Sequence, residues 1–423
     1  MLVESGLVES GRRPLGASAP AAPLRVLVVH NHYRSEQPSG EDRVVEQEIA
    51  LLRGAGVQVA EFTRHSDDIA AMSAVGRARV IAEIPWSRRA GRAFAARLRQ
   101  VRPDVVHVHN TFPMITASVI AAANDAAVPV VATLHNYRLV CPPGTLHRAG
   151  RTCDDCFGRA FPWPAVRHGC YRDSGPATLP LAVATALNRR RWWTGVDRFF
   201  AISAAQRQLL VAAGMPADRL LVKHNFVPAP PVVRADAGEY FLYLGRLAEA
   251  KGVRLLMAAW DRLTADGTGA GLPLVIAGSG DLEAEVTAWA GDRPDVRFLG
   301  LQNRDECARL TARARAVVTP SEWPETFGLV VVEAAAAGVP AVAAAHGAFV
   351  ELIDAGQSGL LHEPGDPDAL CAALRTVADP ATSVRLGQAA RARWSAGFSE
   401  PVATARLLAG YRGVLAGRAE VSV

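Results

Sequence analysis

The sequence has no apolar run long enough to cross a membrane. None of its 423 residues falls in an unbroken apolar stretch of the roughly 20 residues that a spanning helix requires. The first 23 residues also lack the apolar core of a signal peptide and carry glycine, serine and proline, so we interpret residues 1–23 as a flexible leader. Together these absences predict a cytoplasmic protein.

Charge is also scarce, but it is unevenly distributed. Only 21% of the residues are charged and the net charge is +5; we find no nucleic-acid-binding module, so no nucleic-acid partner is expected. Residues 77–102 hold eight arginines against one acid, Glu83, and residues 189–193 read RRRWW. Basic segments with interspersed aromatic residues suit a protein bound peripherally at the inner face of a membrane. The alternative is a solvated helix face whose arginine stems cover the edge of the core.

The length and the order of apolar segments predict two α/β domains. A chain of 423 residues exceeds the usual size of a single core. Short apolar strands alternate with helical or loop segments, which is typical of parallel sheets. We expect strands at 24–30, 57–63, 104–108, 128–134 and 197–202, and, after the proline-rich linker at 227–233, at 241–246, 273–278, 296–300, 316–321 and 340–344.

These segments predict two Rossmann-like domains that face each other across a cleft, where ligands commonly bind. The first domain would span residues 24–230 and the second residues 231–395. The helix at 396–423 could return to the first domain.

Two glutamates, Glu325 and Glu333, lie eight positions apart in the apolar segment SEWPETFGLVVVEAAAAGVPAV. We expect a helix that starts at residues 326–328 and stops at Gly338 and Pro340. Glu325 would then lie at the helix mouth and Glu333 about two turns in, roughly 12 Å further along the axis. Because glutamate is rarely buried without a partner, the pair could bind a ligand with two hydroxyl-rich groups flanking a phosphate. In the structural alternative, the helical glutamate pairs with an arginine or a backbone group.

Four segments of the second domain carry a family resemblance. They read YLGRLAEAKGV (243–253), LVIAGSGD (274–281), VRFLG (296–300) and the segment with the two glutamates. Because the four segments occur in this order and at this spacing, the chain resembles the large retaining glycosyltransferase family four (glycosyl transferases group 1), which has the GT-B fold. The resemblance covers residues 24–415. The resemblance implies a nucleotide-sugar donor, with Glu325 on the sugar hydroxyls and Glu333 on the ribose. The amides around Phe327, Gly328 and Leu329 would meet the phosphates at the helix N-terminus.

A nucleotide-sugar donor releases a charged diphosphate, so its site needs fixed positive charge. We assign this role to Arg246 and Lys251, which follow Gly245 after the first strand of the second domain. Gly278 and Gly280 allow close backbone approach of the donor after their strand. The resemblance implies that no metal or other cofactor is needed for catalysis. We find no convincing nucleophile, which favours retention by same-face attack, with the leaving phosphate taking the acceptor proton.

In the first domain, the resemblance implies a glycine loop after the first strand and a histidine after a later one. Gly40, within PSGED, fits the glycine, and His135, at the end of VVATLHN, fits the histidine. His109 competes with His135 because it also lies at a strand end. His107 lies within its strand and is predicted to be a core residue.

Four of the six cysteines lie in one segment, residues 141–170, which we interpret as an insertion. Cys153 and Cys156 have the Cys-x2-Cys spacing of a zinc site, and Cys141 and Cys170 could complete it. His147 or His168 could replace a thiol, and unliganded reduced cysteines are the alternative, since a reducing compartment disfavours disulfides. A closed zinc site would be structural, holding a long loop beside the acceptor site. Cys307 and Cys371 are predicted to be buried.

The predicted function is transfer of a sugar from a nucleotide-sugar donor to a glycan or lipid-linked acceptor. The cysteine-bearing insertion of this chain is similar to insertions in bacterial members of the family that build cell-surface polysaccharides. A nucleotide-sugar epimerase or phosphorylase of the same fold is one alternative, and a zinc-ribbon binding protein without transferase activity is another. The glutamate pair together with Arg246 and Lys251 favours the transferase, because a binding module would not need them.

Overall fold

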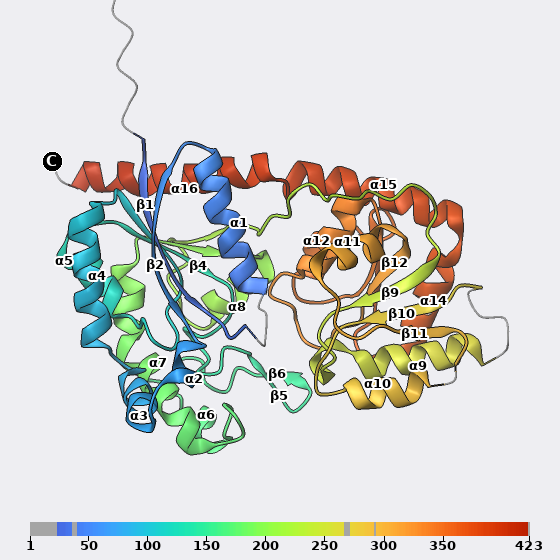
Figure 1. Ribbon diagram of the computed structural model, residues 1–423, viewed down its shortest axis with the longest axis horizontal. Helices are drawn as coiled ribbons and strands as arrows, with labels where there is room; N and C mark the ends of the chain where they lie inside the picture. Colours follow the sequence, from blue (N-terminus) through green and yellow to red (C-terminus); the bar gives the residue numbers. More distant parts are fainter. Residues whose placement is uncertain (1–22, 36–39, 266–270, 292, 422–423) are drawn as a thin grey trace, which may run out of the picture.

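The chain folds into two separate parallel sheets of six strands each. The computed structural model describes residues 23–35, 40–265, 271–291 and 293–421, so most of the leader predicted for residues 1–23 lies outside the described residues. Figure 1 shows one sheet on each side of the molecule, with the chain passing from the first to the second about half-way along its length.

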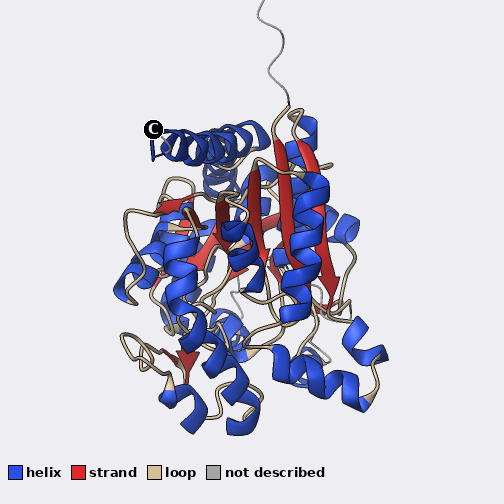
Figure 2. Ribbon diagram, turned by 90° about the vertical axis from the view of Figure 1, so that its left-hand side faces the viewer, coloured by secondary structure: helices blue, strands red, loops and turns tan. Residues whose placement is uncertain are grey.

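The first sheet has the strand order β2-β1-β3-β4-β7-β8, and all of its pairs are parallel. Its central strands read as continuous apolar runs because helices cover both faces; every residue of β3 and β4 is buried. Figure 2, which views the molecule from the side of this domain, shows the strands running beside one another among the helices. The strands are β1 (Arg25–His32), β2 (Gln58–His65), β3 (Val105–Asn110), β4 (Val130–Leu134), β7 (Arg198–Ala201) and β8 (Leu220–Val222).

Serine side chains cap several helices of the first domain. Ser87, Ser174 and Ser203 each accept a hydrogen bond from an amide in the first helical turn, as serine commonly does at this position. A small antiparallel hairpin, β5 (His147–Arg148) and β6 (Arg151–Thr152), lies within the cysteine segment. The helices are α1 (Gly40–Gly54), α2 (Asp68–Ala71), α3 (Ala74–Glu83), α4 (Arg88–Val101), α5 (Ser118–Asp125), α6 (Trp163–Arg167), α7 (Gly175–Gly195) and α8 (Ala204–Ala212).

The second sheet has the order β11-β10-β9-β12-β13-β14, again wholly parallel. Counted along the domain this is the order 3-2-1-4-5-6 of a doubly wound Rossmann sheet. Its strands are β9 (Tyr240–Leu244), β10 (Leu274–Ala277), β11 (Val296–Phe298), β12 (Ala314–Thr319), β13 (Ala341–Ala344) and β14 (Gly359–His362). Its helices are η1 (Glu249–Lys251), α9 (Val253–Thr264), α10 (Glu283–Ala290), α11 (Arg304–Ala312), α12 (Leu329–Ala337), α13 (Phe349–Leu352), α14 (Pro367–Ala378) and α15 (Pro380–Gly397).

The last helix, α16 (Glu400–Val421), packs on the first domain. Its residues Ala403, Leu407 and Tyr411 join a buried cluster with apolar side chains of β1 and α1. Figure 1 shows α15 over the second domain and α16 running along the first. The C-terminal segment therefore contacts both domains.

A buried cluster also joins the domains directly. Ile202 and Val227 of the first domain pack with Phe327, Phe349 and other residues of the second. Glu351 of α13 accepts hydrogen bonds from the amides of Ala204 and Ala205, at the N-terminus of α8, where negative charge is favoured. These contacts fix the two sheets relative to each other, with their ligand-binding edges at one cleft.

Two element boundaries differ from the sequence-based prediction, and four short strands were missed. Helix α12 begins at Leu329, so Glu333 lies about one turn into the helix rather than two. Gly40 is the first residue of α1 rather than a loop residue. The strands β8 and β14 and the two strands of the hairpin are only two to four residues long, which is too short to stand out in the sequence. Among the described helices, none is both long and apolar enough to cross a bilayer.

Candidate active site

A cleft of about 820 Å³ lies between the two domains. Its volume suits a small-molecule ligand, since such pockets measure roughly 300–1,000 Å³. In the second domain it opens at the ends of β9 and β12, where the order of the sheet reverses, and ligands bind at such points. The residues predicted from the sequence that line it are Gly40, His135, Gly245, Arg246, Lys251, Glu325, Phe327, Gly328, Leu329 and Glu333.

Glu325 is held in one position at the floor of this cleft. The ammonium of Lys251 lies 2.5 Å from its Oε1, and the Ser321 hydroxyl donates to the same oxygen at 2.8 Å. Its backbone oxygen accepts from the amide of Ala348. A side chain at Gly347 would come within 2.6 Å of the Glu325 amide, so the β13–α13 loop packs directly on it. The Glu325 carboxylate, 12% exposed, is thus presented to the cleft in a fixed orientation.

Lys251 and Arg246 lie on the loop after β9. The loop is packed tightly, because a Cβ at Gly252 would lie 1.9 Å from the backbone oxygen of Pro320. Arg246 is exposed and lines the cleft; among the described residues it forms no ion pair. Its guanidinium is therefore available to an anionic ligand, to which arginine can donate two parallel hydrogen bonds.

Gly278 and Gly280 do not line the cleft. A Cβ at Gly278 would lie 1.8 Å from the oxygen of Gly245, and one at Gly280 would lie 2.4 Å from the oxygen of Leu247. The close approach that these glycines permit is therefore to the loop that carries Arg246, rather than to a ligand. The two glycines therefore support the site indirectly, through the loop that carries Arg246.

Glu333 forms an ion pair with Arg43 of α1, across the cleft. Burial raises the pKa of Glu333, and the Arg43 guanidinium lowers it. The arginine partner foreseen as the structural alternative thus exists, but it comes from the other domain. Because both side chains line the cleft, a ligand that reaches Glu333 must displace or share Arg43.

The start of α12 presents its backbone to the cleft. Gly328 caps the helix with φ 94°, and a Cβ there would lie 2.5 Å from the Phe349 ring. The Phe327 ring, by contrast, is buried in the cluster between the domains. Phe327 thus contributes its backbone to the cleft, and the first amides of a helix are groups to which anions commonly bind.

His135 reaches the cleft, whereas His109 lies behind it. His109 Nδ1 and His135 Nε2 are 3.0 Å apart, and His109 lines a smaller neighbouring cavity instead of the cleft. Burial, together with the positive charge of Lys223, lowers the pKa of His135 well below 6.5. Its ring is therefore neutral at pH 7 and can act as a hydrogen-bonding group. His107 lies in the core between Thr133 and Tyr411, as predicted.

The sequence reasoning missed a buried ion pair beneath these histidines. Lys223, after β8, lies 2.5 Å from Glu48 Oε2, and His107 Nδ1 lies 3.2 Å from Glu48 Oε1. The signal was present in the sequence, because Glu48 falls on the apolar face of α1 with Val44, Val45 and Leu52. A glutamate in a buried stripe requires a partner.

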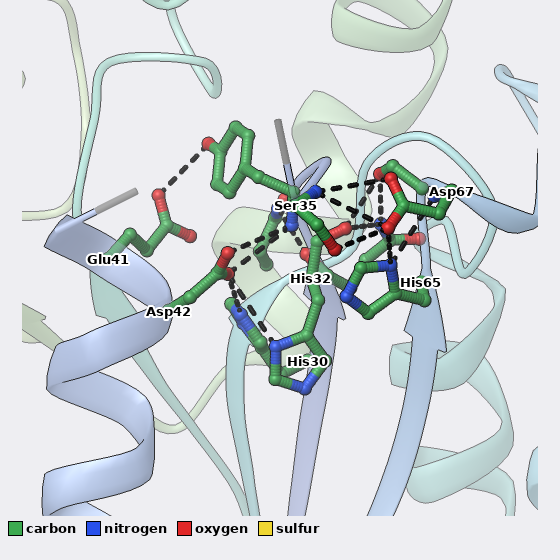
Figure 3. A network of polar contacts seen from close by, with 11 residues as sticks. His30, His32, Ser35, Glu41, Asp42, His65 and Asp67 are labelled. Carbon is green, nitrogen blue, oxygen red and sulfur yellow. Dashed lines mark hydrogen bonds and ion pairs between the residues drawn. The ribbon is translucent and has the colours of Figure 1, made fainter. Parts of the chain in front are cut away.

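A second missed network anchors the start of α1 (Figure 3). His30 Nε2 lies 2.6 Å from Asp42, and the amide of Tyr33 donates to the same carboxylate. The Tyr33 hydroxyl donates to Glu41 at 3.0 Å. These contacts hold the residues next to Arg43 at the edge of the cleft.

Cys307 is a further correction. It was expected to be buried, but it is half-buried and lines the cleft on α11, near Glu333 and Arg43. Cys371 is buried, as predicted.

Two family models together cover most of the chain. One, described as glycosyl transferases group 1, matches residues 231–393, and the other, described as Glycosyltransferase Family 4, matches residues 38–229. Glycogen synthase of Mycobacterium tuberculosis is 32% identical over 360 residues, which make up 82% of this chain and 76% of that protein. The chain belongs to the group 1 glycosyltransferases.

Two further comparisons refine this assignment. The glycosyltransferase is 31% identical over 216 residues to O-antigen chain mannosyltransferase B of Escherichia coli, over 46% of this chain and 56% of that one. The crystal structure of HepE from Anabaena in complex with UDP superimposes with a TM-score of 0.61 at 19% identity, covering 92% of this chain and all of that one. The GT-B fold predicted from the sequence is thereby confirmed.

Proposed function

We propose that this glycosyltransferase moves a hexose from a nucleotide-sugar donor to a glycan or lipid-linked acceptor, with retention of configuration, in the synthesis of a cell-surface polysaccharide. The composition of the cleft is the observation that supports a nucleotide-sugar donor. It combines the Arg246 guanidinium, a lysine, a helix N-terminus and two carboxylates within one cavity. HepE, which shares the fold, binds UDP, and the similarity to an O-antigen mannosyltransferase supports the polysaccharide product.

Each part of the cleft has a chemical role in this proposal. Arg246, Lys251 and the amides at the start of α12 neutralise the diphosphate as it leaves. Glu325 accepts hydrogen bonds from the sugar hydroxyls, and Glu333 accepts them from the ribose. His135, neutral at pH 7, offers its ring from the opposite domain. Its Nδ1 forms no hydrogen bond with any described residue and is therefore available to the sugar.

Retention follows from same-face attack. Glu325 is already bonded to Lys251 and Ser321, which suits orientation of the sugar better than nucleophilic attack on it. The acceptor oxygen forms its bond to the anomeric carbon on the face that the diphosphate leaves. The departing phosphate oxygen takes the proton from the acceptor hydroxyl, so no protein base is required.

UDP is expected to stabilise the protein against heat. The variant Glu333→Gln is expected to weaken UDP binding by roughly 10–100-fold, because hydrogen bonds to a charged group contribute about 1.5–3 kcal/mol. Isothermal titration calorimetry measures the affinity, and thermal shifts with UDP, GDP and ADP compare the bases. Glu283→Gln, exposed on α10 and outside the cleft, is the matched control and should bind UDP normally. The donor proposal fails if none of the three nucleotides stabilises the protein.

A lipid-linked acceptor would be reached at a membrane, and the first domain has a surface that suits one. Val75 and Ile81 of α3 are 75% and 54% exposed, and Trp163 of α6 is 63% exposed. Figure 1 places α3 and α6 at the same end of this domain, and α3 also carries the exposed Arg77 and Arg79. Exposed apolar and basic side chains together suit an anionic bilayer, which would present a lipid-linked acceptor.

The double variant Val75→Ser/Ile81→Ser is expected to lower binding to phosphatidylglycerol vesicles severalfold, since it removes the apolar part of this surface. Cosedimentation measures the bound fraction. Leu301→Ser, which changes an equally exposed leucine of the second domain, should leave it unchanged. Equal binding to vesicles of neutral lipid alone, or none to either, would contradict the membrane role.

A further inference from the structure

Four cysteines that are spread over 30 residues of sequence meet at one small cavity. Cys141, Cys153, Cys156 and Cys170 all line it, together with His147, His168 and Asp155. Its volume of about 20 Å³ is close to the space that a single water molecule needs, and so has room for one ion. All four thiols are free, and none is paired in a disulfide. The two remaining cysteines lie elsewhere, on α11 and α14.

The backbone around the four thiols is arranged in tight turns. The Gly144 amide donates to the Cys141 oxygen at 2.8 Å, and Gly144 has φ 86°. The amides of Cys153 and Cys170 donate to Leu146 and Ala165. The backbone amides of Leu146, Gly144 and Thr145 are directed at the Cys141 sulfur. Amides directed at a sulfur stabilise the thiolate form, which is the form that binds metal.

The other groups at the cavity are less suited to bind an ion. Asp155 is bonded to Arg148 at 2.7 Å, and His168 is exposed. The His147 ring packs near Trp323, with the ring centroids 6.0 Å apart. This leaves four thiols, which is the ligand set of a closed tetrahedral zinc site.

We propose that Cys141, Cys153, Cys156 and Cys170 bind one zinc ion. Four S–H bonds break, four Zn–S bonds form and the protons pass to the solvent, with no change of oxidation state. Among the described residues, the sets of three or more ligand atoms within 4.8 Å are His30–His32–Asp42 and Glu48–His107–His109. No three of the four cysteine sulfur atoms form such a set, so the cysteine side chains must turn inward to bind the ion. In the first of these sets Asp42 contacts His30 and accepts a hydrogen bond from the amide of Tyr33, and in the second Glu48 is paired with the Lys223 ammonium.

The ion would fix a segment that packs against the loop before Glu325. The cysteine segment begins six residues after His135. Its His147 and the preceding Tyr137 both lie near the Trp323 ring, two residues before Glu325. Figure 1 shows the β5–β6 hairpin extending toward the second domain. Since a site with four protein ligands has no open position, the zinc is structural. Its effect on sugar transfer rests on the proposed function, whereas zinc binding does not.

Metal analysis of the full-length protein tests this inference. We expect about one zinc ion per chain by inductively coupled plasma mass spectrometry, because one closed site takes one ion. The double variant Cys153→Ser/Cys156→Ser should lose it, and Cys307→Ser should keep it. His147→Asn should also keep it, and loss of zinc there would overturn the four-thiol ligand set.

A second measurement keeps the test valid if the double variant fails to fold. Wild-type protein stripped of metal and titrated with Co²⁺ should develop the intense visible bands of a tetrahedral thiolate complex at about one equivalent. Absence of these bands, or iron in place of zinc in the purified protein, would overturn the inference. UDP binding by the metal-free protein separates the two proposals, since the donor site can fail or hold independently of the metal content.

Discussion

Replacing Lys251 with alanine is expected to lower kcat/KM for sugar transfer by about 10²–10³-fold, the loss typical for removal of one charge-stabilising group from an active site. Lys251 has two roles in the structure. It holds the Glu325 carboxylate at 2.5 Å, and it shares the cleft with Arg246, where the proposed reaction develops negative charge on the departing diphosphate. Its removal therefore affects both the orientation of the sugar and the stabilisation of the leaving group.

The measurement is the initial rate of UDP release from a UDP-sugar, with and without an acceptor. Because the charge on the leaving group grows in the transition state, most of the loss should appear in kcat rather than in KM. Arg254→Ala is the matched control. Arg254 lies three residues further along, exposed and paired with Glu285 and Glu249 outside the cleft, so its activity should stay near that of the wild type. Equal rates for the two variants would contradict the role of Lys251.

The double variant Lys251→Ala/Glu325→Gln tests whether the two residues act as a unit. Residues in direct contact are not additive, and a carboxylate that has lost its lysine can no longer orient the sugar. We expect the double variant to be only slightly worse than the poorer single variant. Full additivity would mean that the Lys251–Glu325 contact has no part in the reaction.

Local sequence patterns predicted many of the residues that line the cleft, because these residues follow apolar strands. Arg246, Lys251 and Glu325 lie just beyond β9 and β12, and the carboxyl ends of parallel strands at a switch point converge on the ligand. His135 was predicted for the same reason. These assignments needed only the position of each residue relative to its own strand.

The remaining parts could not be predicted, because they depend on how distant segments dock. Arg43 meets Glu333 only because α1 and α12 face each other across the cleft. Gly278 and Gly280 were predicted to approach the donor, whereas the loop that carries Arg246 fills the space next to them. A glycine pattern does not reveal whether a ligand or another loop fills that space. The apolar face of α1 indicates that Glu48 needs a partner, but Lys223 is 175 residues away and no sequence pattern identifies it as that partner.

Glu48→Gln is expected to destabilise the first domain by about 3–5 kcal/mol, the usual cost of breaking a buried ion pair by neutralising one partner. Glu48 and Lys223 are 1% and 4% exposed. The variant leaves the Lys223 ammonium in the core without its counter-ion. At about 2–4 °C per kcal/mol for a domain of this size, the melting temperature should fall by roughly 10 °C, measured by differential scanning calorimetry.

The matched control is Glu46→Gln, on the exposed face of the same helix, and it should melt like the wild type. The double variant Glu48→Gln/Lys223→Met removes the unpaired charge and should recover most of the loss, since replacing a whole buried pair with uncharged groups is often neutral. If the double variant melts as low as Glu48→Gln, the cost does not come from the unpaired ammonium. The network also reaches α16, because Tyr411 contacts His107 at 2.7 Å and His107 lies 3.2 Å from Glu48. Hydrogen exchange in α16 should therefore speed up in Glu48→Gln and slow again in the double variant, which would show that this ion pair helps to hold the C-terminal helix on the first domain.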